Sequence, residues 1–215
     1  MNVLVISSHY NEDLTYMNDI KYPIHVYSHN NLFMPSNFGI IKQIKYNIIP
    51  NIGLDHSSYI KSIIDYYDNI PDKIFFIHGH EMSYHQSDKI SNIINSCNLN
   101  QDFKNLSNIS PYKLDPTANL FLGPKIDVEG YRKLKYAWKY IFEDMYGEIP
   151  EIIQFCVCPQ FMVDKKLILS NPKEYYVKMY DFILNQNCVP DGWVPYIFEY
   201  MYYYMFTKNN IYCEN

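Results

Sequence analysis

Short apolar runs alternate with helical patterns along the first third of the chain. Residues 2–7, 24–27 and 73–77 are rich in β-branched, aliphatic and aromatic side chains, as is typical of buried strands. Apolar residues recur at helical spacing from 59 to 67, and residues 11–17 fit a short helix between the first two strands. The alternation of strands and helices predicts an α/β fold whose central sheet is mostly parallel.

Longer helical patterns follow an irregular stretch in the second half of the chain. Residues 98–128 contain many Asn and several Pro residues and show little periodicity, so we expect long loops there. The remaining pattern predicts a helix at residues 130–146 that stops at Gly147, and a buried strand at residues 152–158. Two further helices are predicted at residues 172–183 and 195–207. Because the pattern shows no domain linker, the sequence predicts one domain over residues 1–215.

The overall composition is that of a globular protein with a sizeable core. Hydrophobic residues make up 48% of the 215 residues, which excludes an intrinsically disordered chain. The formal net charge is −5, with 18 Lys and Arg against 23 Asp and Glu. Nucleic-acid binding depends on a basic surface that neutralises phosphates, so this charge argues against a nucleic-acid partner.

The amino terminus and the cysteines predict a cytoplasmic protein. Residues 2–8 have no basic leader and fit a first strand, and no apolar run approaches the length of a membrane span. The five cysteines are an odd number, so we expect reduced thiols in a reducing compartment. Cys156 and Cys158 should share one face of a regular strand.

A group of ligand-type side chains follows the strand predicted at residues 73–77. His78 and His80 flank Gly79 directly after the apolar run, and His85 follows five residues later. In open α/β sheets, ligands bind beyond the carboxyl ends of the strands. We therefore expect His78 and His80 to bind a metal or a phosphate, with His85 able to join them, and Gly79 to allow close approach of a ligand.

A second polar group follows the first predicted strand. It consists of His9, Tyr10, Asn11, Glu12 and Asp13. These side chains could contact a nucleotide base or ribose at the sheet edge. The alternative is a helix amino terminus, in which Asn11 is the cap and the two carboxylates interact favourably with the helix dipole.

Three other residues are candidates for the site. Asn51 and Gly53 occupy a turn before a helix, where they either meet a backbone requirement or contact a ligand. Glu199 is a carboxylate within the aromatic stretch of the last predicted helix. Burial among aromatic rings raises the pKa of a carboxyl group towards the range of a general base, so Glu199 is the predicted catalytic residue, with a structural tether as the alternative.

The order and spacing of several segments resemble an uncharacterised, glycosyltransferase-like family, a domain of unknown function found in cellular organisms and large DNA viruses. The resemblance extends from the first strand to Phe206. The segments are Ser8-His9-Tyr10-Asn11-Glu12-Asp13-Leu14, Asn51-x-Gly53, the helical pattern from Tyr59 to Asp68 with Ile70-Pro71-Asp72, Phe76-x-His78-Gly79-His80, and Cys158-Pro159-Gln160-Phe161-x-Val163 with Pro172 and Tyr176.

The resemblance implies a nucleotide-diphospho-sugar transferase fold of the GT-A type, which is an α/β/α sandwich. In that fold the turn after the first strand holds the nucleotide, and a strand in mid-domain ends in an Asp-x-Asp motif that carries a divalent metal. Here the corresponding position is His78-Gly79-His80-Glu81. Mn²⁺ and Mg²⁺ prefer oxygen ligands, so this departure leaves metal dependence open. Mn²⁺ or Mg²⁺ remains the expected cation, ahead of Zn²⁺.

Three functions are compatible with the sequence. The leading one is transfer of a sugar from a nucleotide-diphospho-sugar donor to a hydroxyl group of a glycan or protein acceptor. The second is a metal-dependent hydrolase or deacetylase, in which His9, Glu12 and Asp13 join the later histidines around zinc. The third is an inactive module that binds a sugar nucleotide. The donor sugar, the stereochemistry and the oligomeric state are not fixed by the sequence.

Overall fold

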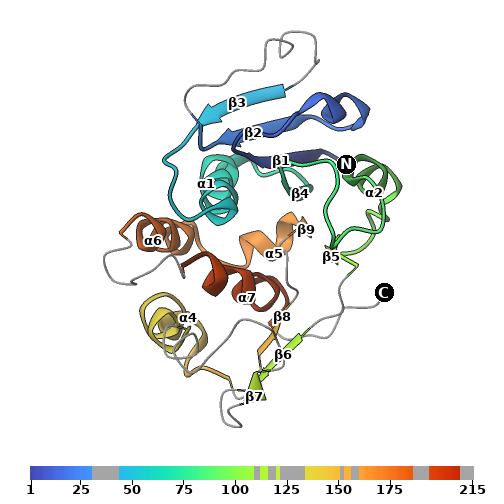
Figure 1. Ribbon diagram of the computed structural model, residues 1–215. Coiled ribbons are helices and arrows are strands. Elements are labelled where there is room, and N and C mark those ends of the chain that lie inside the picture. The colour runs from blue at the N-terminus through green and yellow to red at the C-terminus, as the bar shows by residue number, and fades with distance from the viewer. Residues whose placement is uncertain are drawn as a thin grey trace.

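The structure is a computed structural model that describes residues 1–30, 44–108, 112–115, 120–121, 134–150, 153–155, 160–185 and 194–208. Its main feature is a six-stranded sheet with strand order β3-β2-β1-β4-β9-β5 (Figure 1). The strands are β1 (Val3–His9), β2 (Ile24–Ser28), β3 (Ile44–Ile48), β4 (Lys73–His78), β5 (Phe103–Asn105) and β9 (Phe161–Asp164).

Most of this sheet is parallel, as the sequence predicts. Strands β3, β2, β1 and β4 run in one direction, and β9 is antiparallel to its neighbours β4 and β5. The prediction omits β3 and β9. β9 has only four residues and passes directly into a helix, so its apolar run is too short to be recognised by periodicity.

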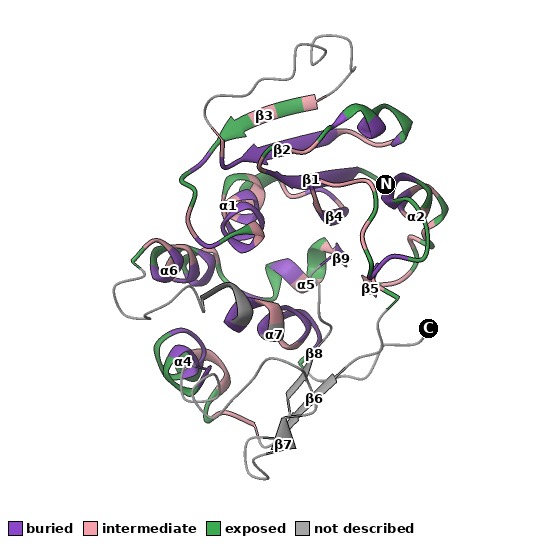
Figure 2. Ribbon diagram, viewed as in Figure 1, coloured by how far each residue is buried: buried purple, intermediate pink, exposed green. Residues whose placement is uncertain are grey.

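Helices and apolar side chains cover both faces of the sheet. One face packs against α1 (Asp55–Tyr66), α6 (Lys173–Leu184) and α7 (Val194–Thr207), and the other against η1 (Thr15–Asp19) and α2 (Ile90–Ser96). Alternate residues of a strand point to opposite faces, so Leu4 and Ile6 join the first core while Val3 and Val5 join the second. The buried strands therefore lie between two helical layers (Figure 2).

The remaining helical elements are short. They are η2 (Tyr67–Asn69), the π-helical turn η3 (Trp138–Phe142), α4 (Glu143–Tyr146) and α5 (Lys165–Leu169). The helix predicted at residues 130–146 is described from residue 134, and Gly147 ends it at a φ of 74°, with its N–H donating to the Glu143 carbonyl. The predicted stop is confirmed.

A second, three-stranded antiparallel sheet has strand order β7-β6-β8. It consists of β6 (Tyr112–Asp115), β7 (Leu120–Phe121) and β8 (Ile153–Phe155). The expectation of loops throughout residues 98–128 is therefore wrong where β5, β6 and β7 form. These strands have two to four residues, so their formation depends on pairing partners rather than on local pattern.

The helix predicted at residues 11–17 is instead the 3₁₀ helix η1, which begins at Thr15. Asn11 does not cap it, because Leu14 is the residue directly before it. The Glu12 carboxylate accepts hydrogen bonds from the N–H groups of Tyr10 and Asn11, and the Asp13 carboxylate accepts one from that of Thr15. These local bonds compete with a first helical turn and delay the start of the helix.

The predictions on cysteines and membrane spans are tested only in the described residues. Cys97 is a half-buried free thiol. The other four cysteines, including the Cys156 and Cys158 pair, lie outside the described residues. Among the helices that the structure describes, none has the length and apolar character required to cross a bilayer.

Candidate functional site

The two polar groups recognised in the sequence leave the sheet at the same edge. Strands β1 and β4 are parallel neighbours, and Ser8 pairs with His78 in their register. The loop that carries His9 to Asp13 and the loop that carries Gly79 to His85 therefore both begin at the carboxyl edge. The two polar groups therefore lie at the same edge of the sheet.

Three histidines form a cluster at this edge. The ring centroids of His78 and His80 are 5.2 Å apart, those of His78 and His85 are 5.8 Å apart, and those of His80 and His85 are 6.5 Å apart. One ring nitrogen from each residue lies within 4.8 Å of those of the other two. His85, which the sequence suggests only as an additional member, thus belongs to the group.

Gln160 links His85 to the end of β4. Its side-chain oxygen accepts a hydrogen bond from the backbone N–H of His78 at 3.2 Å, and its amide nitrogen lies 3.0 Å from Nε2 of His85. Ser83 Oγ lies 2.9 Å from the same Nε2. Gln160 is fully buried directly before β9. Gln160 belongs to one of the segments that carry the family resemblance, but it is not among the site residues predicted from the sequence.

Asp55 places a carboxylate beside the cluster. Its Oδ2 lies 3.5 Å from Nε2 of His78. Burial alone would raise the pKa of this carboxyl group, but the nearby His78 and a hydrogen bond from Ser8 outweigh that effect, and the pKa is lowered. Asp55 is the first residue of α1, and Leu54 before it adopts a φ of 52°. Asp55 is not among the site residues predicted from the sequence.

Glu12 occupies the space beside Gly79. Its Oε2 accepts hydrogen bonds from the backbone N–H groups of Tyr10 at 2.7 Å and Asn11 at 3.1 Å. A Cβ atom on Gly79 would lie 2.8 Å from this oxygen and 2.8 Å from the Ser8 carbonyl oxygen. Gly79 therefore allows close approach of the Glu12 carboxylate, and the predicted approach of a ligand stays a prediction.

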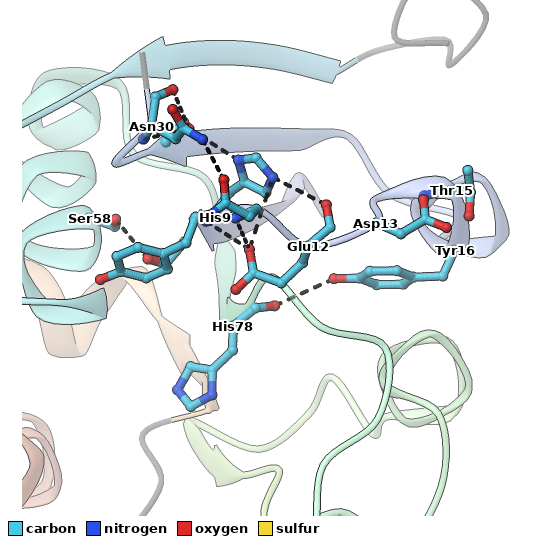
Figure 3. Close-up of polar contacts among 12 residues, drawn as sticks. His9, Glu12, Asp13, Thr15, Tyr16, Asn30, Ser58 and His78 are labelled. Atoms are coloured by element: carbon cyan, nitrogen blue, oxygen red, sulfur yellow. Dashed lines mark hydrogen bonds and ion pairs between the residues drawn. The ribbon is translucent and has the colours of Figure 1, made fainter. Parts of the chain in front are cut away.

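The other side chains of the first loop make further local contacts (Figure 3). His9 is buried, with Nδ1 3.0 Å from Ser28 Oγ and Nε2 3.2 Å from the Glu12 carbonyl oxygen. The Tyr10 ring stacks on His29 with centroids 4.5 Å apart. Asp13 turns towards η1, where Oδ1 accepts a hydrogen bond from the Thr15 N–H.

A chain of hydrogen bonds joins β1, β2 and α1 behind this loop. Ser8 Oγ lies 3.0 Å from Ser58 Oγ, which is 2.9 Å from Nε2 of His29. Nδ1 of His29 donates to the Pro50 carbonyl at 3.0 Å. The chain fixes the start of α1, and with it Asp55, relative to the end of β1.

Burial keeps most of the histidines of this protein neutral. It lowers the pKa of six of the seven, namely His9, His25, His29, His56, His80 and His85. For His85 burial, with His78 and His80 adding to it, lowers the pKa to about 4. A neutral imidazole keeps one nitrogen lone pair, and this is the form that binds metal ions.

We expect the free energy of unfolding to fall as pH decreases from 6.5 towards 4. Between its pKa in the unfolded state and its lower pKa in the folded state, a histidine takes up its proton mainly in the unfolded state, so its contribution is complete above pH 6.5 and is lost towards its folded pKa. Each such histidine changes the stability by up to about 1.4 kcal/mol per pH unit. Urea unfolding across this range, in metal-free buffer, measures the slope.

His56 provides a single-residue check of this pH dependence. Burial lowers its pKa to about 3. In the variant His56→Gln, unfolding between pH 6 and pH 4 should take up one proton fewer. The slope of the free energy of unfolding against pH should therefore be smaller than in wild type, by up to about 1.4 kcal/mol per pH unit. A wild-type stability that stays constant from pH 7 to pH 5, or an unchanged slope in the variant, would contradict the expectation.

Asn51 and Gly53 lie in the turn that leads into α1. Gly53 has a φ of 81°, and a Cβ atom there would lie 2.2 Å from Cγ2 of Ile183 on α6. Asn51 is exposed. The requirement for glycine at position 53 is therefore accounted for by the backbone and by helix packing, which is the structural alternative considered for this turn.

Glu199 lies on α7, which packs against the start of α1. The rings of Phe198 and Tyr202 are 6.1 Å and 5.4 Å from that of His56, and the Tyr202 hydroxyl lies 3.2 Å from Nδ1 of His56. His56 directly follows Asp55. Glu199 itself is half-buried between these two aromatic positions of the helix. Its catalytic role stays a prediction.

Two comparisons with known proteins bear on the identity of the chain. A search of curated proteins finds no match. A family model described as "Protein of unknown function (DUF3431)" matches residues 4–215, which is nearly the whole chain. The protein therefore belongs to the DUF3431 family.

Proposed function

We propose that this protein is a glycosyltransferase of the GT-A type, which moves a sugar from a nucleotide-diphospho-sugar to an acceptor hydroxyl. The observation that supports this most is the meeting of the loop after β1 with the end of β4 at the carboxyl edge. In the GT-A resemblance these two segments hold the nucleotide and the metal. Ligands of open α/β sheets bind at this edge.

The first loop provides suitable groups for the nucleotide. Tyr10 is half-buried and offers an aromatic surface to a base, while Asn11 and Asp13 are exposed in the same loop. Amide and carboxylate oxygens accept hydrogen bonds from ribose hydroxyls. Glu12, which is bound to the loop backbone, acts as a support that shapes the loop rather than as a ligand group.

The histidine cluster lies where a departing pyrophosphate would need positive charge. His78, His80 and His85 each have a buried ring nitrogen without a hydrogen-bond partner among the described residues, so the cluster fits a bound cation. A divalent cation at this position would stabilise the negative charge of the leaving group. Asp55, whose Oδ2 lies 3.5 Å from Nε2 of His78, would place a negative charge beside that cation.

The acceptor hydroxyl also needs a base. In this proposal Glu199 takes the proton, since it lies on α7, whose residues Phe198 and Tyr202 pack against His56 at the start of α1. A positioned general base removes the proton as the hydroxyl attacks the sugar carbon.

The histidine cluster also favours a second candidate function, a metal-dependent hydrolase or deacetylase. Three imidazoles around a metal leave a position for water, and a metal lowers the pKa of such water to the range of a nucleophile. In that case Asp55 or Glu12 would accept the proton of the water. Acetylated sugars would then be substrates, and sugar nucleotides would not.

An assay of nucleoside diphosphate release tests the proposal. We expect one donor from a panel of nucleotide sugars, supplied with Mn²⁺, Mg²⁺ or Zn²⁺, to raise the melting temperature and to release its nucleoside diphosphate slowly to water. Specific binding stabilises the folded form in proportion to affinity. Binding without release in the presence of acceptors would identify an inactive module. Deacetylation of acetylated sugars without any donor binding would replace the proposal by the hydrolase.

A further inference from the structure

We propose that His78, His80 and His85 form a three-imidazole site for a borderline transition-metal ion, with Zn²⁺ as the expected occupant and Asp55 as its charge partner. The inference deepens the proposed function and rests on it only for the role of the metal in catalysis. The affinity for the metal is a property of the protein alone. It can therefore be measured without any sugar nucleotide.

Unsatisfied nitrogen atoms are the first support for this site. Nε2 of His78, Nε2 of His80 and Nδ1 of His85 are buried, and none has a hydrogen-bond partner in the described part of the chain. Buried polar atoms almost always have partners, because an unpaired one loses its hydration without compensation. A metal ion bound between the rings would satisfy all three at once.

The distances are close to those of a metal centre. Zinc–nitrogen bonds of about 2.0–2.1 Å in tetrahedral geometry place the ligand nitrogens about 3.4 Å apart. One nitrogen from each of the three rings already lies within 4.8 Å of those from the other two. Closing the remaining distance, about 1.4 Å or less, requires rotation of the rings and small shifts of the loop between β4 and α2, which carries His80 and His85.

The surroundings of His85 also suit a ligand. If His85 binds the metal through Nδ1, its proton is on Nε2. The Ser83 hydroxyl oxygen, 2.9 Å away, can then accept a hydrogen bond from this N–H. The Gln160 amide nitrogen, 3.0 Å from the same atom, must then turn away from it. Metal-bound histidines usually donate their second N–H to such an oxygen, which fixes the orientation of the ring.

Asp55 provides the compensating charge. Three neutral imidazoles leave the full charge of the ion uncompensated, and Oδ2 of Asp55 lies 3.5 Å from Nε2 of His78. The donor set discriminates between metals, because imidazole nitrogen suits Zn²⁺, Co²⁺ and Ni²⁺ whereas Mg²⁺ requires oxygen ligands. The proposal therefore predicts zinc binding that a large excess of Mg²⁺ does not displace.

Calorimetric titration of the chelator-treated full chain with Zn²⁺ tests the site. We expect one equivalent to bind to wild type. His80→Gln and His85→Gln should each weaken the affinity by more than about 100-fold, since loss of an outer partner alone costs about 10–100-fold. Asp55→Asn should fall within that lower range. Visible absorption after Co²⁺ substitution should report tetrahedral coordination in wild type but not in His80→Gln or His85→Gln.

His25→Gln is the matched control. His25 is another buried histidine whose Nε2 has no hydrogen-bond partner among the described residues, but it lies on β2 and bonds Tyr66 through Nδ1. This variant should bind zinc like wild type. Equal zinc affinity in wild type and in the folded His80→Gln or His85→Gln variant overturns the site, as does binding of Mg²⁺ in preference to Zn²⁺. If one variant does not fold, the other decides. Zinc binding without any effect of sugar nucleotides would leave this site intact and contradict only the proposed function.

Discussion

Replacing Gly53 by alanine should lower the free energy of unfolding by about 2–5 kcal/mol, the largest stability effect that we expect from a single methyl group. Two terms contribute. The φ of 81° is unfavourable for an L-residue, at about 1–2 kcal/mol. The new Cβ atom would also lie 2.2 Å from Cγ2 of Ile183, and such overpacking costs about 1–3 kcal/mol. Urea unfolding followed by circular dichroism measures the loss.

Gly147 separates these two terms. Its φ of 74° is similar to that of Gly53, but a Cβ atom there would meet no atom of the described residues within 4 Å. Gly147→Ala should therefore show only the backbone cost, about 1–2 kcal/mol. Equal losses for the two variants would mean that α6 yields freely at Ile183, and the packing of the turn against α6 would not fix the start of α1.

Replacing Glu199 by glutamine should reduce the turnover of the proposed transfer by about 10²–10⁴-fold, which is the contribution typical of a positioned general base. Glutamine keeps the size and most hydrogen bonds of the side chain, so donor affinity and melting temperature should stay nearly unchanged. Steady-state kinetics with the donor that the panel of nucleotide sugars identifies measure the turnover, and thermal unfolding of the same preparation measures the stability.

A surface carboxylate provides the control for Glu199. Glu174 is exposed in the first turn of α6, so Glu174→Gln should alter neither turnover nor stability. If Glu199→Gln instead loses several degrees of melting temperature and retains its turnover, Glu199 is a structural tether of α7. The base would then have to be sought elsewhere, with Asp55 as the next candidate.

The long buried elements of this fold can be predicted from the sequence, whereas the short paired strands cannot. β1, β4 and α1 have enough apolar residues in a consistent period to be recognised in isolation. β9 and β6 have four residues each, and they form because neighbouring strands offer hydrogen-bond partners. That information lies in the tertiary structure.

The candidate site shows the same division. His78, Gly79 and His80 can be assigned because they directly follow a recognisable strand. Asp55 comes to the site only because α1 begins with the turn at Gly53, and Gln160 only because β9 inserts beside β4. The contacts of both residues connect segments more than 20 residues apart, so no local motif indicates them.

Hydrogen–deuterium exchange with and without a sugar nucleotide tests most directly whether the carboxyl edge of β1 and β4 holds the donor. The account predicts slower exchange in residues 8–13, 55–58 and 78–86 when a donor binds, because ligand contacts suppress local opening of the segments that they hold. Exchange in α2 should stay unchanged. Donor binding that protects a different surface, or no response of these three segments to any sugar nucleotide at saturating concentration, would contradict the account.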